Sequence, residues 1–143
     1  MTALPRAHPP HGFALVDTWT LNRYDDLVHL RAGVTEVITL AMGHGAPRTH
    51  AVTRGLVVVS SELATNALRY AGAPATVTLS SSATSYLLDV ADPDPATVPA
   101  LAHGRAPGDG GLGLRLAERL ASSIGWFTTD RTKHVWATFS RDV

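Results

Sequence analysis

The sequence predicts a single α+β domain, a two-layer α/β sandwich in which a mostly antiparallel sheet is covered on one face by three helices. Three observations favour this class. Two long stretches in the first half carry apolar residues at helical spacing. Two pairs of alternating stretches are each joined by a short polar turn. The segments also follow the order strand, two helices, hairpin, loop, helix, hairpin, which suits one domain of 143 residues.

The composition is that of a globular chain and narrows the classes of function. Apolar residues make up 45% of the sequence and charged residues 17%. The net charge of zero argues against nucleic acid as the main partner, because phosphate backbones require an excess of Lys and Arg. Without cysteine, disulfides, zinc–thiolate sites and thiol nucleophiles are excluded. No apolar run is long enough for a membrane span or a signal peptide, so a cytoplasmic protein is expected.

The first half is expected to hold a tail, a strand and two helices. Residues 1–12 contain three prolines and are expected to form a flexible tail before a domain at 13–143. Residues 13–21 alternate loosely and predict the first strand. Asn22 is expected to cap the first helix, whose apolar positions are Leu27, Leu30, Val34, Val37, Ile38 and Ala41.

The second helix is expected over residues 49–71, with Gly72 as its stop signal. Further apolar residues flank its main stripe, so the helix should be largely buried. The stripe consists of Val52, Leu56, Val59, Leu63, Ala67 and Tyr70.

The second half is expected to contain a hairpin, a long loop, a third helix and a closing hairpin. A loop of this length in a compact domain is usually functional, often a lid. The three tryptophans fall on predicted strands and are expected in the core. The expected segments are 75–80 with 86–91, then 93–110, 112–122, and 124–129 with 134–140.

Three polar residues of the second helix form a first candidate site. Glu62, Asn66 and Arg69 are spaced by four and three residues, which places them on one side at the edge of the apolar stripe. A carboxylate there could accept a proton from a hydroxyl or a water. An amide oxygen could help to hold magnesium. The alternative is a solvated helix face with ordinary polar residues.

Two further candidates lie at either end of the long loop. Asp92 ends an apolar strand and could accept a hydrogen bond from a purine amino group, or could simply begin an Asp-Pro loop. The sequence Gly110-Gly111-Leu112-Gly113-Leu114 runs into a helix, where glycines and free N–H groups favour a phosphate. A plain hinge is the alternative, since the pattern is neither a Walker loop nor a Rossmann turn.

Together these segments resemble a known family. The stretch 61–67 (SELATNA) resembles the N box of GHKL ATPases, and 111–114 (GLGL) resembles their second glycine box. Residues 89–92 resemble the strand that ends in the first-box Asp, and 133–137 resemble the last strand. The likeness covers residues 13–139 and is strongest to anti-sigma-factor serine/threonine kinases of the actinobacterial type.

The resemblance implies a Bergerat fold for the domain, a histidine-kinase-like ATPase unit that binds ATP and magnesium. It implies that Asn66 binds the magnesium, that Asp92 contacts the adenine, and that Glu62 is the general base for a partner's Ser or Thr hydroxyl. The other residues implied at the nucleotide are Arg69, Gly111, Leu112, Gly113 and Leu114. The partners implied are a STAS-fold anti-anti-sigma protein and a sigma factor, hence a role in transcription regulation. A homodimer is also implied. The net charge and the lack of a long apolar run add the expectation of no direct contact to nucleic acid or membrane.

The chain departs from the family pattern in two places. Asp92 is followed by Pro93-Asp94-Pro95, where the family has a glycine two residues after the Asp. His134 stands where a threonine is common, which would remove a hydroxyl near the adenine. Three hypotheses therefore stay open: a protein kinase, a nucleotide-responsive module that binds a partner without phosphorylating it, and an interaction domain that no longer binds ATP.

Overall fold

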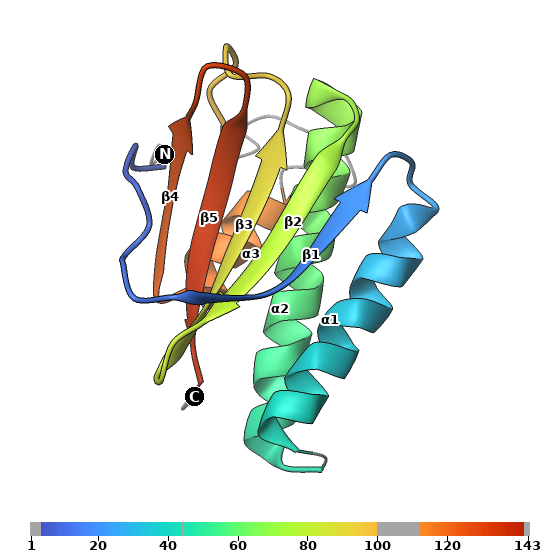
Figure 1. Cartoon of the computed structure of the whole chain (residues 1–143), viewed down its shortest axis with the longest axis vertical. Helices are drawn as coiled ribbons and strands as arrows, with labels where there is room; N and C mark the ends of the chain where they lie inside the picture. Colours follow the sequence, from blue (N-terminus) through green and yellow to red (C-terminus); the bar gives the residue numbers. More distant parts are fainter. Residues whose placement is uncertain (1–3, 44, 100–111, 142–143) are drawn as a thin grey trace.

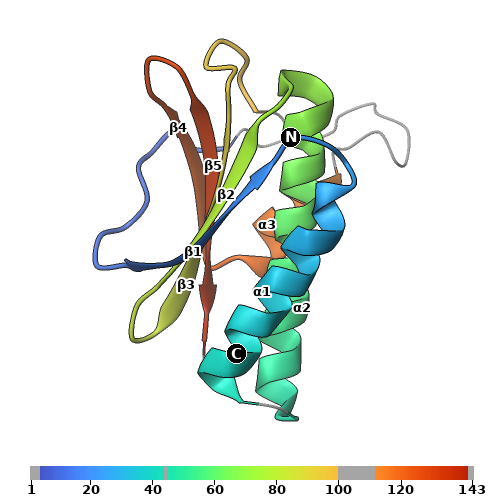
Figure 2. The same ribbon diagram turned by 45° about the vertical axis from the view of Figure 1, so that its right-hand side comes forward.

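The computed structural model describes residues 4–43, 45–99 and 112–141. Within these ranges a five-stranded antiparallel sheet with strand order β1-β2-β3-β5-β4 packs against three α-helices (Figure 1). Figure 2 shows the sheet nearly edge-on, with the helices all on one side. The predicted two-layer α+β class is thereby confirmed. Among the described helices, none combines the length and the apolar character that a membrane crossing requires.

The first half forms the strand and the two helices that the periodicity predicts. They are β1 (Ala14–Leu21), α1 (Asp26–Met42) and α2 (Pro47–Asn66), and α2 continues into a π-helical turn, η1 (Ala67–Ala71). Gly72 ends this helix as expected, with φ at 91° and its N–H donated to the Ala67 carbonyl.

The expected cap of α1 is wrong. The N-cap residue is Asp25, not Asn22. The carboxylate of Asp26 accepts the backbone N–H groups of Asn22 and Arg23, at 2.8 and 3.1 Å. The turn between β1 and α1 is therefore held by Asp26 in the first turn of the helix, whose carboxylate accepts backbone N–H groups of the residues before the helix.

Both hairpins of the second half form with the predicted antiparallel pairing. The elements are β2 (Ala75–Ser81), β3 (Ser85–Asp92), α3 (Leu112–Leu120), β4 (Ser123–Thr128) and β5 (Lys133–Ser140). The central pairing joins β3 to β5, which are distant in sequence, and its register sets Asp92 opposite Lys133. This register decides which side chains meet at the site.

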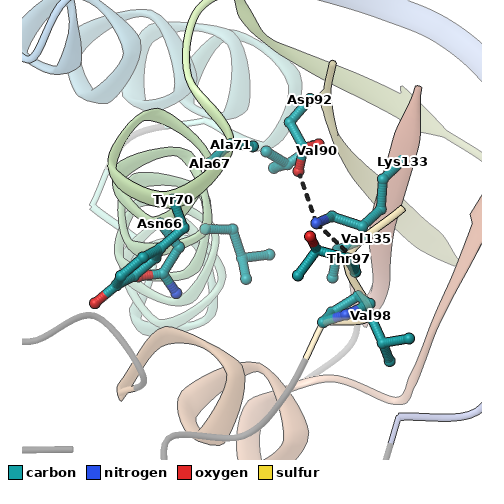
Figure 3. Close-up of a pocket in the computed structure, with 12 residues that line it drawn as sticks. Asn66, Ala67, Tyr70, Ala71, Val90, Asp92, Thr97, Val98, Lys133 and Val135 are labelled. Carbon is teal, nitrogen blue, oxygen red and sulfur yellow. Dashed lines mark hydrogen bonds and ion pairs between the residues drawn. The ribbon is translucent and has the colours of Figure 1, made fainter. Parts of the chain in front are cut away.

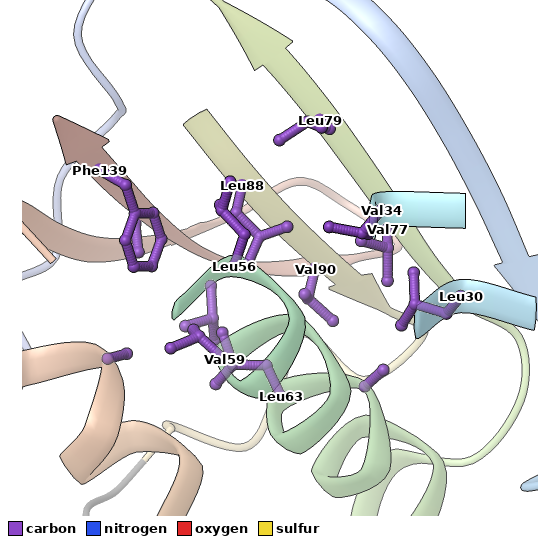
Figure 4. Packing of buried hydrophobic residues seen from close by; sticks show 14 of the residues in the cluster. Leu30, Val34, Leu56, Val59, Leu63, Val77, Leu79, Leu88, Val90 and Phe139 are labelled. Carbon is purple, nitrogen blue, oxygen red and sulfur yellow. The ribbon is translucent and has the colours of Figure 1, made fainter. Parts of the chain in front are cut away.

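The core lies between the sheet and the first two helices. In Figure 4, Leu56 and Leu63 of α2 face the side chains of β3, among them Val90. The predicted stripe of α2 is buried from Val52 to Ala67, but Tyr70 is 50% exposed. Tyr70 leaves the stripe because η1 is wound more widely than an α-helix, which ends the 3.6-residue repeat.

The N-terminal segment differs from the flexible tail expected over residues 1–12. The backbone of Pro5 and Ala7 exchanges hydrogen bonds of 3.0 and 2.9 Å with Trp126 on the edge strand β4. The indole N–H of Trp126 donates to the Leu4 carbonyl at 3.2 Å, and that of Trp136 to the Ala7 carbonyl at 2.8 Å. Both indoles are buried, as predicted for core tryptophans. The segment lies along β4 because that edge offers unpaired backbone groups and the Leu4 side chain is buried there.

Candidate functional site

A cavity of about 90 Å³ lies between the end of α2 with η1 and the ends of β3 and β5 (Figure 3). This volume is well above the ~15 Å³ that a single water needs. Five of the lining residues have polar side chains: Asn66, Tyr70, Asp92, Thr97 and Lys133. The apolar wall includes Leu63, Ala67, Val90, Val98 and Val135. A mostly apolar hollow with a few converging polar groups is typical of a small-molecule site.

Asn66 is the last residue of α2 and lies at the start of the π-helical turn. Its Oδ1 is buried and has no hydrogen-bond partner among the described residues. An orphaned buried oxygen costs about 1–3 kcal/mol, so natural proteins retain few of them without a reason. The π-helical turn that follows places Ala67, Tyr70 and Ala71 on the cavity wall, and π-turns recur at functional sites. The oxygen is suited to a cation or a donor supplied by a ligand.

Asp92 is buried at the end of β3, as the sequence predicts, with 7% of its surface exposed. One carboxylate oxygen, Oδ1, accepts the N–H of Asp94 at 2.8 Å, which closes a tight turn across Pro93. The other, Oδ2, is 3.5 Å from the Nζ of Lys133. Burial raises the pKa of the Asp92 carboxyl, against the opposing effects of the Asp94 N–H and the Lys133 charge. The turn forms without the glycine of the family pattern because the Asp92 side chain itself accepts the Asp94 N–H.

Lys133 is the site residue that the sequence reasoning missed. It is 7% exposed, faces Asp92 across the β3–β5 register, and donates from Nζ to the Thr97 carbonyl at 2.9 Å. A nearly buried lysine is uncommon unless it is paired. The local signal is weak, because a lysine at the start of a strand is usually solvated. Only the non-local pairing of β3 with β5 shows that it meets Asp92.

His134 lies on the opposite face of the sheet. Its ring stacks on Phe127 with centroids 4.5 Å apart, and its two nitrogens pair with Asp89 and Thr132 at 2.8 and 2.9 Å. Neighbouring residues of a strand point to opposite faces, and Val135 lines the cavity. His134 therefore does not face the cavity. The β5 position that faces Asp92 belongs to Lys133.

Glu62 and Arg69 do not line the cavity, although they share a helix with Asn66. Glu62 lies one turn before Asn66, is partly exposed, and its carboxylate has no hydrogen bond or ion pair with a described residue. Arg69 is exposed, and its guanidinium is 5.9 Å from the ring centroid of Tyr70. Hydrogen bonds to Tyr70 and Tyr24 raise the pKa of Arg69. Among these three helix residues, only Asn66 meets Asp92 at the cavity.

The glycine-box candidates are described only in part. Gly111 lies outside the described residues, and Leu112, Gly113 and Leu114 form the first turn of α3. That helix packs against α2.

Comparison with models of protein families and with curated proteins finds no match to this chain. The interpretation of the site therefore depends on its geometry and on the resemblance of its sequence segments.

Proposed function

We propose that the chain is an ATP-binding regulatory protein with a Bergerat-type fold and that the cavity receives the nucleotide. The observation that carries this proposal is that the unsatisfied amide oxygen of Asn66 and the buried carboxylate of Asp92 line the same cavity. Asn66 and Asp92 come from segments far apart in the chain, yet both line it. These are also the two residues that the family resemblance assigns to magnesium and to the base.

The chemistry of the residues present fits magnesium and a purine nucleotide. A hard oxygen such as Asn66 Oδ1 suits magnesium, which keeps several waters and phosphate oxygens and needs few protein ligands. The Asp92 carboxylate would accept an N–H of the base, and the apolar wall would pack against the ring. When bound, Mg-ATP would supply the phosphoryl group for transfer and the cation that offsets its charge.

We further propose that Glu62 acts as the general base of a protein serine/threonine kinase. Its carboxylate is partly exposed, has no hydrogen bond or ion pair with the residues that the structure describes, and lies one helical turn from Asn66, so it could accept a proton from a hydroxyl on a docked partner. The resemblance supplies the partner: a STAS-fold anti-anti-sigma protein as substrate, with a sigma factor sequestered by the same chain.

Calorimetric titration with Mg-ATP tests nucleotide binding. The wild type should bind, and Asn66→Ala should weaken binding by at least about tenfold, the value of one lost charge-assisted contact. Thr65→Ala is the matched control on the same helix, because its hydroxyl bonds to the Ser61 carbonyl and does not line the cavity. No heat and no thermal shift for the wild type, or equal binding by Asn66→Ala, would contradict the proposal.

Transfer of radiolabelled phosphate to a STAS-fold partner tests the kinase step. Glu62→Ala should abolish transfer while Mg-ATP still binds. A second candidate function is a nucleotide-responsive module that binds its partner without phosphorylating it, which is favoured by the position of Glu62 outside the cavity wall. Equal partner binding by wild type and Glu62→Ala, with no transfer by either, would select this candidate.

A further inference from the structure

The polar end of the cavity holds two opposite charges side by side. Asp92 and Lys133 are each 7% exposed, and their Oδ2 and Nζ atoms are 3.5 Å apart. Burying such a pair carries a large desolvation penalty, and replacing it by apolar residues is often neutral for stability. A buried ion pair that lines a cavity therefore points to a ligand that uses both groups. Figure 3 shows the pair at the edge of the hollow, opposite Asn66.

Both members of the pair retain hydrogen-bonding capacity. The Lys133 ammonium carries three N–H groups, of which Asp92 and the Thr97 carbonyl take two. The Asp92 carboxylate has about four lone-pair positions, of which the Asp94 N–H and Lys133 use two. The cavity end therefore offers one donor next to an acceptor.

The two common classes of purine differ in how they would meet these groups. A 6-aminopurine presents an N–H at position 6 beside a lone pair at N1, and a 6-oxopurine presents the reverse, an oxygen beside the N1–H. A carboxylate alone favours the first and repels the oxygen of the second. An ammonium next to the carboxylate can donate a hydrogen bond to O6 of a 6-oxopurine. The same ammonium can equally donate to N1 of a 6-aminopurine.

We propose that Lys133 is a base-selectivity residue that widens the site to 6-oxopurines, so that guanine and hypoxanthine nucleotides bind alongside adenine nucleotides. The N1–H of the 6-oxopurine is donated to Asp92, and its O6 accepts from Lys133. This inference rests on the proposed nucleotide site and concerns which bases that site takes.

Calorimetric titration of the full chain with ADP, GDP and IDP tests the inference, because the three ligands share the same diphosphate tail. The wild type should bind GDP and IDP within about tenfold of ADP. IDP isolates the contact at O6, since hypoxanthine lacks the 2-amino group of guanine. Lys133→Met should weaken the binding of GDP and IDP at least about tenfold more than that of ADP, because the Asp92 carboxylate left alone repels O6 of the oxo bases but still accepts the 6-amino N–H of adenine. Lys133→Arg keeps the cation and should retain binding of all three.

The outcomes separate this inference from the proposed function. If ADP binds while GDP and IDP bind at least a hundredfold more weakly than ADP, the selectivity inference is overturned and the proposed nucleotide site stands. Equal weakening of all three ligands by Lys133→Met overturns it as well. If none of the three binds the wild type, both proposals fall. The wild-type series decides the question even if Lys133→Met, which leaves Asp92 unpaired, does not fold.

Discussion

At the scale of single residues, Asp92 links the site to the pH dependence of stability. Burial raises its pKa above the ordinary 3.8, so the native state holds this proton more tightly than the unfolded chain. Stability must then fall as pH rises from about the unfolded pKa through the raised native one. Relative to Asp92→Asn, the wild type is expected to lose stability with rising pH in this window. Urea unfolding of both proteins across a pH series measures the difference, and a pH-independent difference would contradict the prediction.

Asp26 provides a control of opposite sign in the same chain. The N–H groups of Asn22 and Arg23 lower the pKa of this partly exposed carboxyl below 3.8. Its contribution is therefore present above the unfolded pKa and is lost as pH falls through the native one. Relative to Asp26→Asn, the wild type should gain stability with rising pH over this lower range. If the two comparisons had slopes of the same sign, the assigned causes would be wrong.

At the scale of elements, two helix glycines predict opposite outcomes for the same substitution. A Cβ at Gly33 in α1 would lie 2.9 Å from Cε2 of Trp19, whereas one at Gly55 in α2 would lie 3.9 Å from the ring of Phe139. Gly55→Ala should stabilise by ~0.5–1 kcal/mol through helix propensity. Gly33→Ala should destabilise by ~1–3 kcal/mol because the indole must move. Denaturant unfolding of both variants measures these changes in stability. Stabilisation by Gly33→Ala would show that the Trp19 side chain can move aside at little energetic cost.

The elements also show what the sequence can and cannot predict. Both helices of the first half and both hairpins were predictable because their signals are local: spacing, turn residues and the stop at Gly72. Asn66 and Asp92 could be singled out from local signals, Asn66 from its spacing with Glu62 and Arg69 on the second helix and Asp92 from its place at the end of an apolar strand. Lys133 was not, since its partner is fixed by the pairing of β3 with β5. The exposure of Tyr70 also escaped prediction, because no apolar pattern distinguishes a π-helical turn from an α-helical one.

At the scale of the whole molecule, the two edges of the sheet are protected in different ways. On one edge, β1 carries an irregularity in its register between Leu15 and Asp17, a feature that hinders pairing with another strand. On the other edge, the segment around Arg6 forms a parallel bridge with Trp126 of β4. The arginine also lies 4.8 Å from the centroid of the Trp126 ring. The N-terminal segment thus extends the sheet by backbone pairing and covers an indole with a cation.

This placement predicts that Leu4 belongs to the core although it lies among residues expected to form a tail. Leu4 is 4% exposed, so Leu4→Ala should destabilise the chain by ~2–4 kcal/mol. Leu15→Ala removes the same atoms from a side chain that is 66% exposed and should cost less than ~0.5 kcal/mol. Denaturant unfolding followed by tryptophan fluorescence measures the stability of both variants. The fluorescence of the buried Trp126 indole, which bonds to the Leu4 carbonyl, should be sensitive to Leu4→Ala. If the two substitutions had equal small effects, residues 4–8 would not contribute to the folded domain and the sheet would end at β4.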